Sequence, residues 1–347
     1  MPISAHRRQT VFGLGALGAV ALLPRDAKAD LAALATAARK EAAVTWYVAQ
    51  LDAERAERIA KEFTADYPGI TVSVIRTTGQ VAFQRLLMDI KNHTPQCDVF
   101  SATDISHMPI LKDRHELTPY TPENAQGLLP PFARLSDPNN YYITNASRYF
   151  LIYNTKKVAA KDAPKAWTDL LDPKWKGQVA LGHPAFSGCM GTLVATLRKQ
   201  YGWEFFEKLA KNNPRIGRSA ADPVTLITAG ECLVGPASAS GAYPAIDKGN
   251  PLGVMHPADG LFVCTGPSAI PANAPHPNAA RLFMEWLLGE HYSRLVASDG
   301  SEPLRDGIKP RPDEPLLATQ KILSLTVEEI RKDVPEVIEQ WRDTFGS

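Results

Sequence analysis

The sequence predicts an α/β fold built as two lobes that are joined by two extended crossings. Its 347 residues exceed the size at which a single hydrophobic core usually keeps growing. Short apolar runs alternate with amphipathic helical patterns along most of the chain. Two irregular stretches, residues 138–142 and 257–267, divide this alternation into segments. The hydrophobic content of 44% and the charged content of 22% are ordinary for a globular protein.

The first segment consists of consecutive strand–helix units. Residues 44–48, 71–75 and 97–101 are short apolar or alternating runs with the length of a strand. Asp52 is placed to cap a helix after the first of these runs. Successive β-α-β units predict a mostly parallel sheet covered by helices. The helices between the strands carry apolar residues at helical spacing, namely Ala56, Ile59, Ala60 and Phe63 in one and Phe83, Leu86, Leu87 and Ile90 in the other.

The later segments repeat this style without repeating the sequence. One long amphipathic helix is expected over residues 276–297. Because the chain leaves the first lobe near residue 140 and returns near 262, we expect residues 144–261 to form lobe two. Residues 30–143 and 262–347 then form lobe one, and the two crossings act as a hinge beside a cleft. Further strands are expected at residues 149–153, 178–181, 232–235 and 252–255.

The N-terminus has the pattern of an export signal over residues 1–29. Arg7 and Arg8 precede an apolar run, and a small-x-small cleavage site follows at residues 27–29. The paired arginines favour the twin-arginine route, with an ordinary secretory signal as the alternative. The apolar run is shorter than the roughly 20 residues that span a bilayer, and no cysteine lies near the cleavage site. We therefore expect a soluble periplasmic protein without a lipid anchor.

Charge and cysteine content restrict the partners of the chain. The formal net charge is +1, and residues 1–29 carry four basic residues and one acidic residue, so their removal leaves −2. A nearly neutral chain argues against a nucleic-acid partner or an acidic membrane surface. Cys97, Cys189, Cys232 and Cys264 are too far apart for a C-x-x-C site or a disulfide scaffold. Buried free thiols are the favoured interpretation, and a disulfide is the alternative.

Several stretches follow one another in an order that resembles a known family. The most specific are YNTK at residues 153–156 and WTDLLDPKWKG at 167–177, with DVF at 98–100, LTPY at 117–120 and AGE at 229–231. This order resembles the type II periplasmic solute-binding proteins of bacterial ABC importers. Within them it is most similar to the branch of ferric-ion, thiamine, phosphonate and sugar-phosphate binders. The resemblance implies a Venus-flytrap architecture that closes on a ligand and docks, as a monomer without a cofactor, on an inner-membrane permease.

In this branch the ligand lies between loops that open helices in both lobes. The first turn of a helix presents unpaired amides and the positive end of the helix dipole, which suit an anion. Ser, Thr and Gly are also the usual residues of caps and turns, so a purely structural role is the alternative. The candidate ligand-binding residues of this kind are Thr78, Gly79 and Gln80 in lobe one and Ser187, Gly188, Ser238 and Ser240 in lobe two.

Arg148 is expected to supply the charge that holds the ligand. It starts the 149–153 strand beside the first crossing, and a guanidinium can bind an oxyanion bidentately. The alternative is a surface salt bridge. Thr103 and Asp104 follow the 97–101 strand at its carboxyl end, the usual ligand edge of an α/β sheet, although Asp104 is also placed to cap a helix. Tyr47, His183 and Tyr243 are further candidates, each with a core position as the alternative.

The available hydroxyls, amides and arginine predict a small organic anion as the ligand, either a carboxylate, a phosphonate or a phosphate ester. The first alternative is a ferric ion. Iron binders of the branch carry two adjacent tyrosines after a lobe-two strand, whereas residues 238–243 here hold a single tyrosine. A ligand-sensing partner of a membrane receptor is another alternative. A hydrolase using His183 and Ser187 is the least favoured, because no catalytic motif is present, and we expect neither an enzyme nor a metal site.

Overall fold

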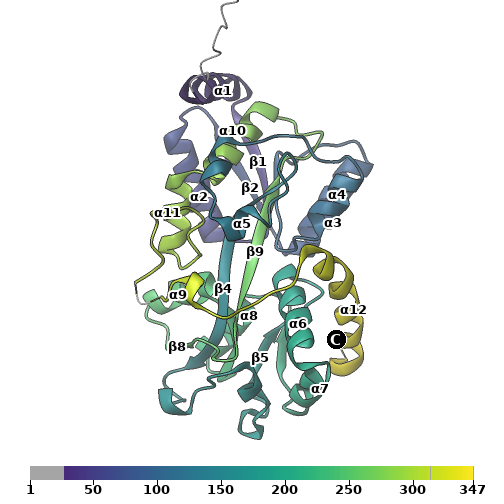
Figure 1. Ribbon diagram of the computed structural model, residues 1–347, viewed down its shortest axis with the longest axis vertical. Helices are drawn as coiled ribbons and strands as arrows, with labels where there is room; N and C mark the ends of the chain where they lie inside the picture. The colour runs from purple at the N-terminus through teal and green to yellow at the C-terminus, as the bar shows by residue number, and fades with distance from the viewer. Residues whose placement is uncertain (1–26, 313, 347) are drawn as a thin grey trace, which may run out of the picture.

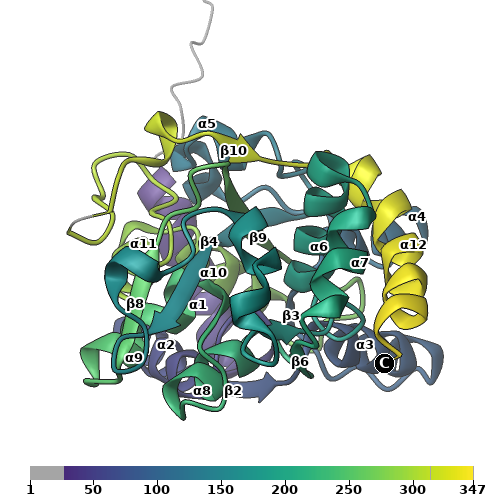
Figure 2. The ribbon, with the colours of Figure 1, turned by 90° about the horizontal axis from the view of Figure 1, so that it is seen from below.

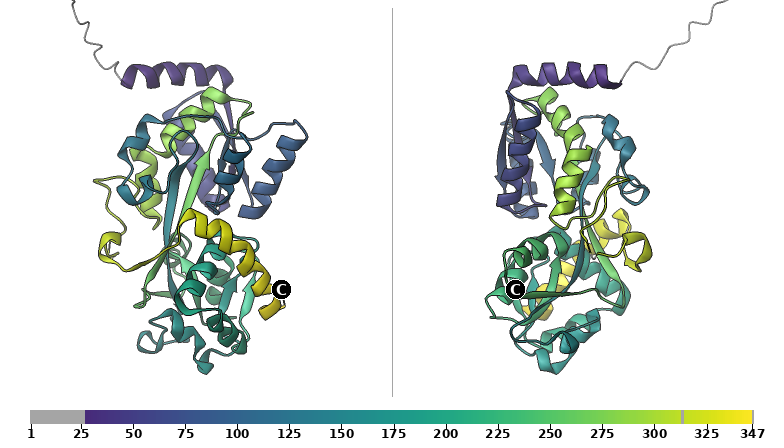
Figure 3. Two further views of the ribbon diagram at one scale, coloured as in Figure 1. Left: turned by 45° about the vertical axis from the view of Figure 1, so that its right-hand side comes forward. Right: turned by 90° about the vertical axis from the view of Figure 1, so that its left-hand side faces the viewer.

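The computed structural model describes residues 27–312 and 314–346, and the predicted signal segment up to residue 26 lies outside this part of the chain. Two lobes lie one above the other along the long axis (Figure 1), and extended strands run between them (Figure 3). The α/β class and the two-lobed architecture predicted from the sequence are confirmed. Within the described residues, no helix combines the length and apolarity needed to cross a membrane.

Lobe one is the body built around three parallel strands. The helix α1 (Ala27–Glu41) was not anticipated. It packs on α10, and the carboxylate of Glu41 accepts hydrogen bonds from the amides of Asn278 and Ala279 at the start of that helix. The other elements of lobe one are β1 (Ala43–Val48), α2 (Ala53–Asp66), β2 (Thr71–Arg76), α3 (Gly79–Lys91), β3 (Val99–Ser101), α4 (His107–Asp113), α5 (Pro130–Ala133), α10 (Pro277–Leu287) and α11 (Glu290–Ser298).

Lobe two is formed by shorter strands with helices around them. Its two-stranded parallel sheet of β5 and β6 lies beside the long central sheet. The elements are β5 (Ala180–Gly182), α6 (Gly188–Tyr201), α7 (Glu204–Lys211), β6 (Arg215–Gly217), α8 (Asp222–Thr228), β7 (Val234–Ser238), α9 (Ala239–Asp247) and β8 (Leu252–Met255).

The strands β4 (Tyr142–Asn154) and β9 (Leu261–Ala269) connect the lobes. The first begins where the expected crossing at residues 138–142 ends, and the second overlaps the expected crossing at residues 257–267. The main sheet has the order β2-β1-β3-β9-β4-β7, with β8 on β4 and β10 (Ile322–Leu323) on β9. In lobe one β1 pairs in parallel with β2 and β3, but β9 is antiparallel to both β3 and β4. The expected mostly parallel sheet is therefore wrong for its centre. The reason is that β4 carries the chain into lobe two and β9 brings it back.

The C-terminal helix α12 (Val327–Phe345) corrects the expectation that residues 262–347 lie wholly in lobe one. It packs along α6 and α7 of lobe two (Figures 1 and 2). Its buried face points at α6, where a methyl carbon of Val334 lies 2.9 Å from the position that a Cβ on Gly191 would take. Trp203 donates to the hydroxyl of Thr344 at 3.0 Å. The segment between α11 and α12 therefore passes from one lobe to the other a third time.

The predicted single helix over residues 276–297 is also corrected. The structure divides it into α10 and α11, with the break at Leu288 and Gly289. Gly289 is the N-cap of α11, and a Cβ at this position would lie 3.1 Å from the carbonyl oxygen of Trp286. The apolar periodicity continues across this break because both helices cover the same core, so the pattern alone did not reveal it.

Candidate functional site

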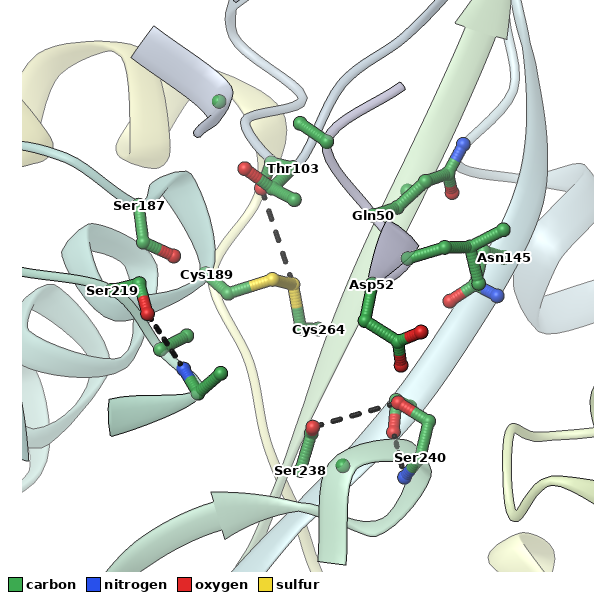
Figure 4. Close-up of a pocket in the computed structure, with 18 of the residues that line it drawn as sticks. Gln50, Asp52, Thr103, Asn145, Ser187, Cys189, Ser219, Ser238, Ser240 and Cys264 are labelled. Carbon is green, nitrogen blue, oxygen red and sulfur yellow. Dashed lines mark hydrogen bonds between the residues drawn. A yellow bond between two sulfur atoms is a disulfide. The ribbon is translucent and has the colours of Figure 1, made fainter. Parts of the chain in front are cut away.

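A cavity of about 120 Å³ lies between the lobes at the middle of the crossing strands, and we call it the front pocket. Figure 4 shows side chains from both lobes directed into it. Lobe one contributes the segments at the ends of β1, β2 and β3. The crossing strands β4 and β9 form the floor of the pocket. Lobe two contributes the starts of α6 and α9. The polar lining residues used below are Asp52, Arg55, Arg76, Thr78, Thr103, Asn145, Ser147, Tyr149, Ser187, Ser219, Ser238 and Ser240.

Two arginines of lobe one line the front pocket. Arg55 lies in the first turn of α2 and is buried. Its Nε donates to Asp52 at 2.7 Å, but its Nη1 is buried and has no hydrogen-bond partner within the described residues. Arg76 ends β2 and donates from Nε to the carbonyl oxygen of Leu51 at 3.0 Å. A buried guanidinium nitrogen without a partner is costly unless a ligand binds it, so this corner has the chemistry of an anion site.

Asp52 holds Arg55 in place. Its carboxylate accepts from the backbone amide of Arg55 at 2.9 Å and caps α2. Burial alone raises the pKa of Asp52, but the charge and the hydrogen bonds of Arg55 outweigh burial and leave this pKa below its usual value. Asp52 is therefore ionised at neutral pH, and it orients the guanidinium next to the cavity.

Two threonine hydroxyls face the same cavity without partners. Thr78 is the N-cap residue of α3 but makes no side-chain cap hydrogen bond, and Thr103 follows β3. The Oγ1 atoms of both are buried and unpaired within the described residues. Gly79 allows this arrangement, because a Cβ there would lie only 2.3 Å from Oγ1 of Thr103. The start of α3 is thus pressed against Thr103, and both hydroxyls are free for a ligand.

Lobe two presents neutral donors. Ser187 caps α6 through a long contact from the amide of Met190 at 3.5 Å. Ser238 is the N-cap residue of α9 without a side-chain cap bond, and its hydroxyl lies 3.5 Å from that of Ser240. The first amides of these two helices have no partner within their own helix. Ser219 also lines this wall, with its hydroxyl donating to Asp222 at 2.8 Å.

The floor of the pocket uses alternate residues of β4. Asn145, Ser147 and Tyr149 line the cavity, as expected when successive side chains point to opposite faces of a strand. The hydroxyl of Ser147 accepts from the amide of Ser240 at 3.2 Å and joins the strand to α9. Burial raises the pKa of Tyr149 well above its usual value, so its phenol is neutral.

Six of the predicted site residues line the front pocket: Thr78, Gly79, Thr103, Ser187, Ser238 and Ser240. Gly188 lies next to it at the start of α6, packed on Asp104. The carboxylate of Asp104 accepts from the amide and the hydroxyl of Ser106, the N-cap residue of α4. Asp104 is thus engaged within lobe one, but it does not itself cap this helix as the alternative expected.

The other predicted residues are engaged elsewhere. The hydroxyl of Tyr47 donates to Asp89 at 2.7 Å inside lobe one. Gln80 is hydrogen-bonded to His107 at 3.1 Å. His183 accepts from the amide of Ala185 at 3.0 Å, and the ring of Tyr243 packs against Phe150. Neither His183 nor Tyr243 is among the residues that line the front pocket.

Arg148 requires a correction. It belongs to β4, but it points to the face opposite Asn145, Ser147 and Tyr149 and does not line the front pocket. Its guanidinium is buried and pairs with the carboxylates of Glu302 and Glu314. Burial alone lowers the pKa of Arg148, but these two carboxylates outweigh it and raise this pKa. Arg148 therefore ties β4 to the segment before α12 and is not available to a ligand.

Sequence reasoning missed both pocket arginines. A signal was present, because Asp52 was recognised as a helix cap and Arg55 stands in the first turn of that helix. Arg76 directly precedes the predicted loop at Thr78. A cation at the end of a strand or in the first turn of a helix lies at the ligand edge of the sheet. Such a position predicts a ligand contact better than a position inside a crossing strand does.

The cysteines also differ from the expectation of free thiols. Cys189 and Cys264 form a disulfide with 5.5 Å between their Cα atoms, and both line the front pocket. Cys97 and Cys232 are buried and free. The bonded residues are 75 positions apart, so only the folded arrangement of α6 against β9 brings them together.

The comparison with protein families decides the identity of this fold. The model of the bacterial extracellular solute-binding proteins matches residues 95–333, which is more than half of the chain. The chain belongs to this family. The resemblance stated from the sequence is thereby confirmed, and so is the general role of a periplasmic solute-binding component of an ABC importer.

Curated relatives of this solute-binding protein are not named for one common ligand. It is 24% identical over 253 residues to an uncharacterized protein of Haemophilus influenzae, covering 70% of this chain and 72% of the relative. It is 29% identical over 202 residues to a Salmonella typhimurium protein named provisionally as 2-aminoethylphosphonate-binding. This match covers 55% of this chain and 52% of the relative, so the chain spans about half the length of that relative. It is 24% identical over 346 residues to an Fe(3+)-binding periplasmic protein of Serratia marcescens, covering 91% and 98%.

Solved structures agree on the fold. The periplasmic binding protein AfuA from Actinobacillus pleuropneumoniae, with fructose 6-phosphate bound, superposes with a TM-score of 0.76 at 21% identity, covering 87% of this chain and 98% of AfuA. Iron-bound HitA from Pseudomonas aeruginosa gives a TM-score of 0.74 at 22% identity, covering 87% and 99%. At this level of identity, these similarities establish the type II binding-protein fold and leave the ligand to the site.

Proposed function

We propose that this solute-binding protein captures a small organic anion between its lobes and delivers it to an inner-membrane ABC permease. The proposed ligands are phosphonates, phosphate esters and carboxylates, in that order of preference. One observation carries the proposal: three buried donors, Nη1 of Arg55 and the Oγ1 atoms of Thr78 and Thr103, line one small cavity and have no partner among the residues that the structure describes. A ligand with several charged oxygens would satisfy them together.

The distribution of charge supports the order of preference. Arg55 and Arg76 are the cations of the front pocket, and Asp52 is its carboxylate. Two guanidinium groups favour a doubly charged phosphonate or phosphate over a single carboxylate. Asp52 offers a place for an ammonium or hydroxyl group carried by the same ligand. One relative is named for 2-aminoethylphosphonate, and a similar structure was solved with fructose 6-phosphate. The first of these ligands carries an ammonium group and the second carries hydroxyl groups, which adds support.

A ferric ligand is the competing proposal, because the Serratia relative is named for Fe(3+). Hard metal ions of this kind need several carboxylate or phenolate oxygens. In the described part of the chain, no three His, Cys, Asp or Glu side chains gather as a metal site. Tyr149, whose phenol is kept neutral by burial, is the tyrosine that lines the cavity. These observations favour the oxyanion.

The proposed mechanism is closure of the two lobes about β4 and β9. A ligand favours the closed form only through contacts that the open form lacks. Lobe one supplies the charged groups, and lobe two adds the amides and hydroxyls at Ser187, Ser238 and Ser240. We further propose that the protein acts in the periplasm after removal of residues 1–29 and carries no lipid anchor, which N-terminal sequencing of the exported protein would check.

A thermal-shift screen of the purified mature protein tests the proposal. The panel contains 2-aminoethylphosphonate, fructose 6-phosphate, inorganic phosphate, citrate, thiamine and ferric citrate. A ligand that binds only the folded state stabilises it by mass action and so raises the melting temperature. At a ligand concentration a hundredfold above Kd, the free energy of unfolding increases by about 2.7 kcal/mol. We expect a phosphonate or a phosphate ester to give the largest rise. Stabilisation by ferric citrate alone, reversed by a chelator, would overturn the proposed ligand class.

A further inference from the structure

The disulfide joins the two parts of the molecule that must keep their relative positions for anion binding. Cys189 is the second residue of α6 in lobe two, and Cys264 is the fourth residue of the crossing strand β9. Figure 4 shows the bond in the wall of the front pocket, between the side chains of Ser187 and Asp52. Both cysteines are buried. The covalent link therefore lies beside the proposed ligand, in the wall of the front pocket.

The first turn of α6 lies directly against lobe one, next to the residue that the bond ties to β9. A Cβ on Gly188 would lie 2.4 to 2.6 Å from atoms of Asp104, so the two backbones touch without room for a side chain. Within the described residues, no hydrogen bond or ion pair joins Ser187, Gly188 or Cys189 to lobe one, and Sγ of Cys264 lies 4.0 Å from the carbonyl oxygen of Thr103. The disulfide is thus the bonded connection that fixes this helix start at the hinge.

One of the two bonded cysteines, Cys264, lies between two cavities. A larger hollow of about 1060 Å³ lies behind β9, between α5, the start of α12 and the segment that precedes it. Val263 and Thr265 line this hollow, whereas Gly266 lines the front pocket, as expected from the alternation of a strand. Cys264 and Thr103 line both cavities. Cys264 and Thr103 therefore form the partition between the polar pocket and the hollow behind it.

We propose that Cys189 and Cys264 are positioning residues for ligand binding. Their disulfide fixes the start of α6 so that its free amides and the hydroxyl of Ser187 meet the anion that lobe one holds. The proposal rests on the proposed function. A dithiol breaks the sulfur–sulfur bond, each cysteine gains one electron and one proton, and the dithiol becomes a disulfide itself. The helix start then moves freely relative to Thr103, the partition loosens, and water from the hollow competes for the anion.

The test compares the oxidised protein with the folded protein after treatment with dithiothreitol, and with the variant that combines Cys189→Ser and Cys264→Ser. Isothermal titration calorimetry with 2-aminoethylphosphonate and with inorganic phosphate measures affinity, and stopped-flow measurements give the dissociation rate. We expect an affinity at least about tenfold lower in both altered forms, mainly through faster dissociation. Reoxidation should restore the affinity of the reduced protein. An affinity within about twofold of the oxidised protein in both forms would overturn the proposal.

Matched controls separate the bond from general effects of thiols. Cys97→Ser and Cys232→Ser change buried free cysteines outside the front pocket and should bind as the unmodified protein does. Dithiothreitol should leave the double variant unchanged. Small-angle scattering without ligand adds a readout that does not depend on ligand identity, because a released α6 should widen the average opening of the lobes. If the oxidised protein binds none of the anions, the proposed function fails, and the scattering result alone then supports or overturns the positioning role.

Discussion

The two walls of the front pocket differ in charge. The lobe-one wall carries Arg55, Arg76 and Asp52, together with threonine hydroxyls that have no partner in the described part of the chain. The lobe-two side chains that line the cavity, among the residues described, are serines and apolar groups without a formal charge. Lobe one therefore has the chemistry to attract and orient an anion in the open state, and lobe two has the chemistry to complete its hydrogen bonds after closure.

This difference suggests how affinity and rate are divided between the lobes. Charged groups act at a distance and increase the rate of encounter, and their effect decreases with added salt. Neutral amides and hydroxyls act only in contact, so they mainly slow dissociation. Substitutions on the two walls should therefore differ in their salt dependence and in the rate constant that they change.

The largest effect is expected for Arg55→Gln. The substitution removes a buried charge that has a free donor facing the ligand, and its loss should weaken binding by about a hundredfold, near 3 kcal/mol. Calorimetry with the best anion of the screen measures it. The matched control is Arg294→Gln on the exposed face of α11, where the arginine pairs with Glu290. Equal affinity of Arg55→Gln and the unmodified protein would remove Arg55 from the site.

Thr78→Val and Thr103→Val should each weaken binding by about tenfold. Each substitution keeps the shape of the side chain and removes a buried hydroxyl that has no partner within residues 27–312 and 314–346. For the same reason the melting temperature of the unliganded protein should stay the same or rise. Lower affinity together with unchanged or higher stability identifies a ligand contact. Loss of stability with unchanged affinity would show that these hydroxyls serve the fold.

The combination of Ser238→Ala and Ser240→Ala tests the neutral wall. We expect binding to weaken by several-fold, about 1 kcal/mol, through a faster dissociation rate and an unchanged association rate. Stopped-flow measurements at low and high salt distinguish the walls. For the serine variant, the ratio of its Kd to that of the unmodified protein should be independent of salt. For Arg55→Gln, the same ratio should vary with salt. A strong salt dependence of the serine variant would contradict the division between the lobes.

The smallest effect concerns pH and lobe one alone. His107 stacks on Phe83 beneath α3, and burial lowers its pKa below the usual 6.5, although the nearby carboxylate of Asp104 acts in the opposite direction. The neutral ring is thus favoured in the folded state. Its contribution to stability is present above pH 6.5 and is lost as the pH falls through the lowered pKa. Between pH 7 and pH 5, the melting temperature should decrease less steeply for His107→Gln than for the unmodified protein. The same decrease in melting temperature in both proteins would contradict this role of His107.

The fold was predictable where local patterns decide it. The first lobe has strand–helix units with clear periodicity, and β1 and β2 appear within a residue or so of their expected bounds. The break at Gly289 and the position of α12 were not predictable, because the same apolar faces would pack equally well in an unbroken helix or on the other lobe. Choosing between such arrangements requires the tertiary contacts.

The site was only partly predictable, for a reason that Arg148 illustrates. Small polar residues at helix starts carry a recognisable pattern, and Thr78, Ser187 and Ser238 were found in this way. Inside a crossing strand, however, neighbouring residues point to opposite faces. The sequence places Arg148 on β4 but does not say which face meets the ligand. The structure shows that the face of Ser147 and Tyr149 lines the pocket.

The most direct test is a crystal structure of the mature protein with a phosphonate bound. The anion should lie between the closed lobes, with its oxygens about 3 Å from Nη1 of Arg55 and from the hydroxyls of Thr78 and Thr103. Amides at the start of α6 or α9 should contact it from lobe two. An anion bound outside the front pocket, or an iron ion held by Tyr149 in its place, would contradict the account.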